Sequence, residues 1–339
     1  SQTEEEDRRH GFGATSAVTF ALPRGDVTAG FETRLDQSDY ENWFTTGRQR
    51  DSAQTLVDAR QLSGALFVQS SLDLGRHVRA TLGGRYDAQD TRSTPSGGAA
   101  VSASKGLFAP KVGLLAHVPA FGAVYVNVSR GFRQTDGVIT DPTLPFITAW
   151  AYEVGAKLDR GPLSAGVALF RMDVSNEQTF DPITLTSLSG GESRRQGLEL
   201  DAQARLLPSL RFDADWTFTD AKYRHLITAD GDTLDGARVF NTARYVGTAG
   251  LTFAPPGAGW HVRVSTNAVG PYSPFDEPGV ELPAYALLHL SAGAQLGSET
   301  TLEVGVRNVL DRAFPELRAG GFVSPGQPRS VYATLRVVH

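Results

Sequence analysis

The stretch LRFDADWTFTD, residues 210–220, alternates between apolar and polar side chains at nearly every position. The apolar and aromatic positions are Leu210, Phe212, Ala214, Trp216 and Phe218. Arg211, Asp213 and Asp215 stand between them. A period of two is that of an extended strand, whose successive side chains point to opposite faces. The stretch therefore predicts a long strand with one face in an apolar environment and the other in water.

The same alternation recurs along the whole chain. It is clear in GLELDAQARL (197–206), WHVRVSTNAV (260–269) and TLEVGVRNVL (301–310), with a further run at 10–20. In total the chain contains about fifteen such runs, most of ~10 residues, and no convincing helix pattern. The predicted fold class is all-β.

Composition excludes several kinds of function. The 339 residues carry a formal net charge of −5, from 32 basic and 37 acidic residues, whereas a nucleic-acid surface normally shows a basic stripe. The chain has no cysteine, which excludes thiolate metal sites, a catalytic thiol and disulfides. Its histidines are scattered, and the hydrolase, metalloprotease and phosphate-loop motifs are absent. We therefore predict neither an enzyme nor a cofactor.

The connections between the predicted strands alternate in length. Tight turns are expected at 23–26, 74–76, 119–122, 159–162, 207–209, 255–259 and 296–300. Long polar stretches fall between them, near 39–58, 89–105, 133–148, 174–194, 222–242, 271–283 and 311–328. Short periplasmic turns alternating with long extracellular loops are typical of outer-membrane barrels, whose tilted strands need ~9–11 residues. We therefore predict an antiparallel transmembrane β-barrel.

The cost of charge in lipid orients these strands. An Arg that faces lipid at the bilayer midplane costs about 2–4 kcal/mol. The side chains that should therefore face the lumen are Arg211, Asp213 and Asp215. Those that should face the bilayer are Leu210, Phe212 and Ala214.

Eight segments have loose motifs in a characteristic order. They are LSGALFVQSSLDLGRHVRATLGGRYD (62–87), GLFAPKVGLLAHVPAFGAVYVNVSRGFR (106–133), AYEVGAKL (151–158), ESRRQGLELD (192–201), TDAKY (219–223), GPYS…LPAYALLHL (270–290), VRNVLDRAF (306–314) and SPGQPRSVYATLRV (324–337). In this order they resemble the β-barrel of TonB-dependent outer-membrane receptors, over most of the chain.

The resemblance implies a domain organisation. Such receptors have a plug domain and a TonB box, and neither these nor a signal peptide is recognisable in the sequence. With about fifteen strands against the 22 of plugged transporters, residues 1–339 are expected to form the C-terminal portion of the barrel. Bacterial barrels have an even number of strands, with both termini in the periplasm. Counting back from the C-terminus, the strand at 10–20 should run from the outside toward the periplasm, which places residues 1–9 in an extracellular loop.

The last strand is expected to serve barrel assembly. The apolar alternation continues there at Val331, Ala333, Leu335 and Val337. His339 stands where these barrels normally end on an aromatic residue that helps the assembly machinery to recognise the strand.

The function implied by the resemblance is energised uptake of a scarce ligand, most often a ferric siderophore. Cobalamin and saccharide remain open as ligands. The implied partners are the bilayer, the barrel assembly machinery, and the TonB complex acting through the plug. Extracellular loops offer aromatic and cationic groups for an anionic, ring-bearing chelate. The candidates are Tyr40, Trp43, Arg48, Arg50, Arg133 and Tyr272.

Three alternatives belong to other classes. A passive porin of 16 strands fits this chain length without truncation. A soluble β-sandwich is disfavoured by strand length and loop asymmetry, since globular strands are usually ~5–6 residues long. An outer-membrane enzyme lacks a catalytic constellation.

Overall fold

The computed structural model of the chain describes residues 2–119, 121–134, 141–181, 186–228, 231–274, 279–319 and 322–338. These residues contain 17 strands and no helix, so none of them forms a helix able to span a membrane. The strands are β1 (Gln2–Leu22), β2 (Gly25–Thr46), β3 (Gln49–Asp73), β4 (Val78–Pro95), β5 (Val101–Val118), β6 (Gly122–Arg133), β7 (Ile147–Arg160), β8 (Leu163–Asp181), β9 (Thr186–Leu207), β10 (Leu210–His225), β11 (Tyr245–Phe253), β12 (Trp260–Val269), β13 (Tyr285–Gln295), β14 (Thr300–Arg307), β15 (Pro315–Ala319), β16 (Phe322–Pro325) and β17 (Ser330–Val337). The all-β prediction is confirmed.

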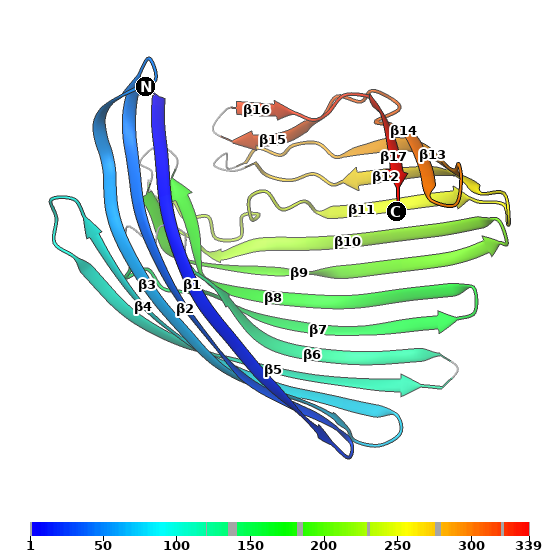
Figure 1. Cartoon of the computed structure of the whole chain (residues 1–339), viewed down its shortest axis with the longest axis horizontal. Coiled ribbons are helices and arrows are strands. Elements are labelled where there is room, and N and C mark those ends of the chain that lie inside the picture. Colours follow the sequence, from blue (N-terminus) through cyan, green and yellow to red (C-terminus); the bar gives the residue numbers. More distant parts are fainter. Residues whose placement is uncertain are drawn as a thin grey trace.

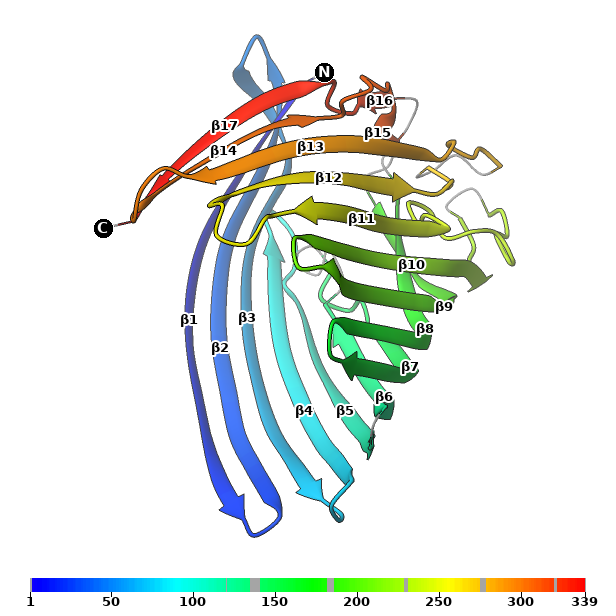
Figure 2. The ribbon, with the colours of Figure 1, turned by 90° about the vertical axis from the view of Figure 1, so that its right-hand side faces the viewer.

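Fifteen strands form one antiparallel sheet in which each strand pairs with the next along the chain. Its order is β1 to β14 followed by β17, and β15 and β16 form a separate hairpin within the last connection. The sheet curls into a trough that is open on one side (Figures 1 and 2). Among the described residues, β1 and β17 occupy its two edges and do not pair with each other.

The connections at one end of the sheet are short, as predicted. Each odd-numbered strand from β1 to β13 is followed by a short connection, the longest being 254–259. Connections at the opposite end include the long ones at 134–146, 226–244, 270–284 and 308–329. By the predicted orientation, the short connections mark the periplasmic end and the long ones the outer end.

Three of the predicted long loops are wrong. The stretch 39–58 is the outer end of β2 and β3, joined by a tight turn in which Gly47 and Arg48 have φ of 57° and 68°. Much of 89–105 and 174–194 is likewise strand, and residues 2–9 belong to β1 rather than to a loop. β3 therefore has 25 residues instead of ~10. Both faces of these outer segments are polar, so the hydropathy of successive residues does not alternate. The backbone hydrogen bonding between neighbouring strands nevertheless continues.

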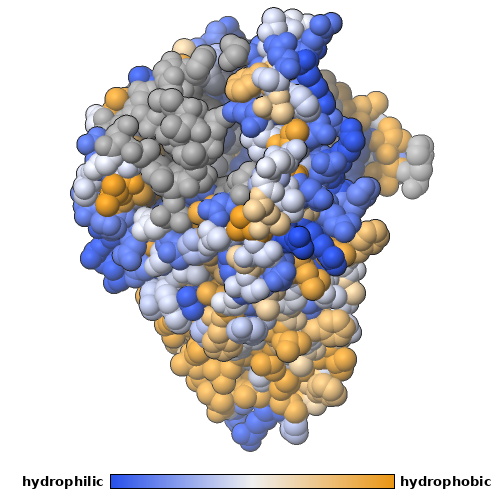
Figure 3. Space-filling model, turned by 90° about the vertical axis from the view of Figure 1, so that its left-hand side faces the viewer, coloured by the Kyte–Doolittle hydropathy of each residue, from blue (hydrophilic) through white to orange (hydrophobic). Residues whose placement is uncertain are grey.

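The two faces of the sheet differ as predicted. In β10, Asp213 accepts hydrogen bonds of 2.5 and 2.7 Å from Arg263 of β12 on the inner face. Phe212 and Phe218 point the other way. The outer face of the long strands exposes large apolar side chains at Phe12, Val18, Phe20, Phe31, Leu62, Leu66 and Val68. Figure 3 shows the resulting apolar band, with hydrophilic surface above it and a hydrophilic tip below. A continuous apolar surface of this kind marks a membrane contact.

Two outer connections pack in ways that the pattern does not predict. The connection between β10 and β11 packs on the end of β10 around a small apolar core, the β10–β11 loop core, formed by Ala221 and Tyr223 of β10 with Leu226 and Val239 of the connection. The segment 141–146 lies against β5, where the Lys105 ammonium donates a hydrogen bond to the Leu144 carbonyl. The same ammonium lies 5.7 Å from the ring of Phe146, which is buried.

Candidate functional site

Polar side chains cover the inner wall of β2, β3 and β4 near its outer end. Because alternate residues of a strand share a face, the segment 85–93 places Arg85, Asp87, Gln89, Thr91 and Ser93 on one side. In the register of the sheet, Ala65 of β3 lies opposite both Asp87 of β4 and Glu32 of β2. In the same way, Ser63 lies opposite Arg34 and Gln89. The long strands therefore bring charged and amide side chains of three strands together.

The charged groups of this wall hold one another in place. The Arg85 guanidinium donates to both carboxylate oxygens of Asp87, each at 2.9 Å, and to Glu32 at 2.6 Å. The Asp87 residue is only 9% exposed, so its charge is compensated by this pairing. On β2, Arg34 donates hydrogen bonds of 2.6 and 2.7 Å to Asp36.

A hollow of about 230 Å³ lies against this wall. Phe132 near the end of β6 borders it, together with Gln134 and Phe146 of the connection between β6 and β7, and the two phenyl rings are 4.9 Å apart. We call it the inner-wall pocket. Its remaining lining residues are Glu32, Thr33, Arg34, Gln61, Ser63, Gly64, Ala65, Arg85, Asp87, Ala88 and Gln89.

The pocket is equipped for binding a polar ligand. Arg34 offers five N–H donors in total and spends two nitrogens on Asp36, so further donors remain, and its side chain is 63% exposed. Gln61 and Gln89 each donate 3.1 Å hydrogen bonds to the Thr91 hydroxyl, which fixes the amides beside the hollow. Among the described residues there is no group of His, Asp and Glu that could hold a metal ion. The arrangement suits recognition of an anionic or hydrogen-bonding ligand.

The candidates predicted between residues 39 and 50 fall on different sides of the sheet. Tyr40 lies on the inner wall of β2, further out along the strand than Arg34. Burial, followed by a hydrogen bond to Glu5, raises the pKa of the Tyr40 phenol. Arg48 is exposed in the turn between β2 and β3. Tyr40 is thus the candidate of this stretch that faces the lumen.

Trp43 and Arg50 lie on the outer face. β1 and β2 pair without a bulge from Leu22 to Gln2, so Glu4 and Glu6 share the face of the lipid-facing Phe12. Arg50 of β3 reaches these two glutamates of β1, which places it on that face as well.

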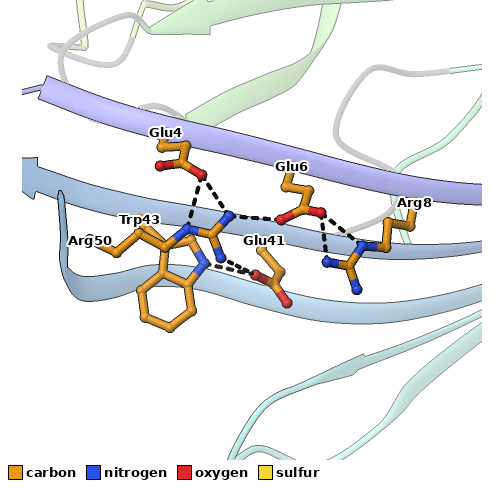
Figure 4. Close-up of polar contacts among 6 residues, drawn as sticks. All are labelled: Glu4, Glu6, Arg8, Glu41, Trp43 and Arg50. Carbon is orange, nitrogen blue, oxygen red and sulfur yellow. Dashed lines mark hydrogen bonds and ion pairs between the residues drawn. The ribbon is translucent and has the colours of Figure 1, made fainter. Parts of the chain in front are cut away.

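The contacts around Arg50 form what we call the outer-face ion cluster (Figure 4). The Arg50 guanidinium lies 2.6 Å from Glu4, 2.7 Å from Glu6 and 3.0 Å from Glu41. The Trp43 indole N–H donates a 2.9 Å hydrogen bond to Glu41, and its ring lies 5.3 Å from the Arg50 guanidinium carbon. Hydrogen bonds from Arg50, and secondly from Arg8, lower the pKa of Glu6. The cluster ties the outer ends of β1, β2 and β3 together.

The other two candidates lie elsewhere. Arg133 is the last residue of β6, opposite Ile147. Tyr272 is 8% exposed within the connection between β12 and β13, where its backbone pairs with that of Leu282. The fold therefore does not bring the six predicted residues into one site. The inner-wall pocket was missed because residues 89–93 are polar on both faces of the strand, which hides their period of two.

The last strand, β17, lies at one edge of the sheet. β17 pairs with β14, and the side chains of Val331, Ala333, Leu335 and Val337 lie on the outer face. On its inner face, the Tyr332 hydroxyl donates to Glu303 at 3.1 Å. His339 lies outside the described residues.

Comparison with known proteins identifies the family. The chain is 27% identical over 288 residues to the metal-pseudopaline receptor CntO of Pseudomonas aeruginosa, covering 80% of this chain and 40% of that receptor. It is 29% identical over 184 residues to the ferrichrome outer membrane transporter/phage receptor of Escherichia coli K12, covering 51% of this chain and 24% of the transporter. The chain thus spans less than half the length of these relatives.

A solved structure gives the same fold. The copper transporter OprC superposes with a TM-score of 0.83 at 12% identity, covering 99% of this chain and 57% of that chain. The family model described as "TonB dependent receptor-like, beta-barrel" matches residues 1–309. This chain therefore belongs to the TonB-dependent receptor family, whose members reside in the outer membrane of Gram-negative bacteria.

Proposed function

We propose that this chain is the C-terminal portion of the barrel domain of an outer-membrane receptor for energised uptake of a ferric siderophore. Two relatives support this class of ligand, one a metal-pseudopaline receptor and the other a ferrichrome transporter. The partial coverage of both, and the unpaired edges of β1 and β17, support a larger barrel that includes further strands.

The inner-wall pocket is the observation that supports a chelate ligand best. It is level with Leu62 at the outer margin of the apolar band, where a ligand arriving from outside would first meet the lumen. Arg34 supplies guanidinium donors beyond those that bind Asp36, while Phe132 and Phe146 supply aromatic surface. This combination suits an anionic, partly aromatic chelate better than a neutral sugar. We retain Tyr40 and Arg133 as proposed contacts of the ligand further toward the outside.

The proposed partners follow from the same assignment. TonB would act through a plug domain that is separate from residues 1–339. The assembly machinery would recognise β17, and the bilayer would contact the apolar band. We infer that no covalent chemistry takes place. The comparisons give no support to the passive-porin alternative.

Uptake of radioactive iron tests this proposal directly. Iron would be supplied as its ferrichrome, catecholate and citrate complexes to cells with and without the receptor, each in the presence and absence of TonB. We expect uptake of at least one complex to require both proteins. Receptor-dependent uptake that persists without TonB would favour the porin.

A matched pair of arginines tests the pocket itself. Arg34 and Arg8 each pair with a carboxylate two residues away, and their side chains are 63% and 65% exposed. They lie on opposite faces of the sheet, Arg34 inside and Arg8 outside. We expect Arg34→Gln to weaken binding of the transported chelate about tenfold, as for loss of one charge-assisted hydrogen bond. Arg8→Gln should leave binding unchanged, and equal effects would exclude the pocket.

A further inference from the structure

A groove of about 410 Å³ opens on the outer face of β10–β13, outside the lumen. Its lining is mostly aromatic or small, with one charged residue. We call it the outer-face groove, lined by Trp216, Phe218, Tyr245, Ala268, Ala284, Tyr285, Ala286 and Arg312.

The groove results from large side chains that lie flat over small ones. The Trp216 ring covers Gly247 so closely that a Cβ there would come within 2.3 Å of it, and Tyr245 covers Gly270 in the same way at 2.8 Å. The rings of Trp216 and Phe218 both lie about 6 Å from that of Tyr245 and form one wall. On the next strands Ala268 and Ala286 fill little space, so a channel remains beside the rings.

Arg312 lies at the groove on a rigid support. Asn308, which is 2% exposed, accepts a 2.9 Å hydrogen bond from the Arg312 backbone N–H and donates one of 2.9 Å to its carbonyl. The Arg312 guanidinium donates to the Ala284 carbonyl at 3.1 Å. Among the described residues no carboxylate pairs with Arg312, in contrast to Arg50, Arg85 and Arg263. Within that part of the chain, its guanidinium retains free donors and has no ion-pair partner.

We propose that the outer-face groove binds an anionic acyl lipid of the outer leaflet, with the headgroup at Arg312 and an acyl chain beside Trp216. The groove faces the bilayer side of the sheet. Tyr245 begins β11 at its outer end, and Phe218 of β10 lies directly opposite it, with Trp216 two residues further inward. Aromatic side chains favour this interfacial depth, and a guanidinium binds phosphate oxygens in a fork geometry. An apolar channel next to a guanidinium that has no carboxylate partner among the described residues complements both parts of such a lipid.

Native mass spectrometry of the receptor, purified from outer membranes in detergent, tests the site. The added probe is phosphatidylglycerol, with phosphatidylcholine of the same acyl chains as the neutral lipid. We expect the wild type to retain phosphatidylglycerol about tenfold more strongly, and Arg312→Gln to lose that preference. Ala286→Phe, which fills the channel, should lower retention of both lipids.

A second exposed arginine provides the control. Arg60 lies on the outer face of β3, is exposed, and has no carboxylate partner among the described residues, but it does not line the outer-face groove. Arg60→Gln should keep the wild-type preference. The proposal is overturned if Arg312→Gln keeps the wild-type preference for phosphatidylglycerol. It is also overturned if Arg60→Gln loses that preference to the same extent as Arg312→Gln. A heat-dependent shift in gel mobility shows that each variant is folded. Inorganic phosphate at the same concentration as the lipid should not displace the lipid from the receptor.

Discussion

The outer side of this sheet is constructed differently over β1–β3 and over β10–β13. Over β1–β3 the strands simply continue past the apolar band and end in a two-residue turn at Gly47 and Arg48. Over β10–β13 the strands stop sooner, and the connection 226–244 packs with the end of β10 around the β10–β11 loop core. The outer ends of β1–β3 are held by backbone hydrogen bonds between the strands and by exposed ion pairs. The connection after β10 is held by burial of apolar side chains.

The difference indicates where stability resides outside the membrane. Exposed ion pairs typically contribute about 0–1 kcal/mol, whereas a buried leucine side chain contributes several times more. The extension of β1–β3 should therefore open more easily than the β10–β11 loop core. Local opening measured by hydrogen exchange distinguishes the two regions.

The largest effect is expected in the β10–β11 loop core. Leu226 is 2% exposed, and its carbonyl accepts the 2.9 Å hydrogen bond from the Leu234 N–H. Leu226→Ala should lower the local opening free energy of 226–239 by about 2–5 kcal/mol, because it leaves a cavity. The measurement is hydrogen exchange of those amides in the folded receptor. The neighbouring Ile227, 50% exposed, is the control, and Ile227→Ala should change little.

The next effect tests the two faces of one long strand. Leu66 of β3 is 67% exposed within the apolar band, whereas Gln69 points to the lumen. Leu66→Arg should lower the free energy of unfolding in lipid vesicles by about 2–4 kcal/mol, because the guanidinium then faces hydrocarbon. Gln69→Arg should be tolerated. If both substitutions cost the same, the assignment of faces in β3 is wrong.

The smallest effect is expected in the outer-face ion cluster. The pKa of Glu6 is lowered from its usual 4.5, so its stabilising contribution is complete above that value and is lost as the pH falls through the lowered pKa. Hydrogen exchange in residues 2–9, corrected for the intrinsic rate, should therefore accelerate below about pH 4.5. The groups that face Glu6 are Arg50, Arg8, Glu4 and Glu41.

A substitution separates this cluster from the rest of the extension. Arg50→Gln should accelerate exchange in residues 2–9 already at neutral pH and remove most of the acid dependence. Arg48→Gln, in the adjacent turn, should have no effect, since Arg48 is exposed at the tip. If hydrogen exchange is unchanged in Arg50→Gln, the backbone hydrogen bonds between the strands hold the outer ends of β1–β3 without help from the ion cluster.

Sequence reasoning succeeded where one face of a strand is apolar. In β10, the alternation of Phe212 with Asp213 predicted both the strand and its orientation, and the ion pair with Arg263 agrees. It failed at 39–58, because polar residues on both faces remove the signal while the backbone ladder persists. The six candidate residues were chosen by chemical type within stretches assumed to be loops. The pleat instead separated Tyr40 from Trp43 and Arg50.

The sequence by itself determined the all-β class, the short turns at one end and the lipid-facing residues. These depend on local periodicity, which reports whether each side chain meets oil or water. Only the tertiary structure decided which residues share a site. Cross-strand register placed Glu32, Ala65 and Asp87 side by side although they are distant in the chain. Asn308 likewise holds Arg312 beside Ala284. Contacts between residues that are distant in the chain depend on where each strand ends and the next one begins. The hydropathy pattern does not mark those ends where both faces of a strand are polar.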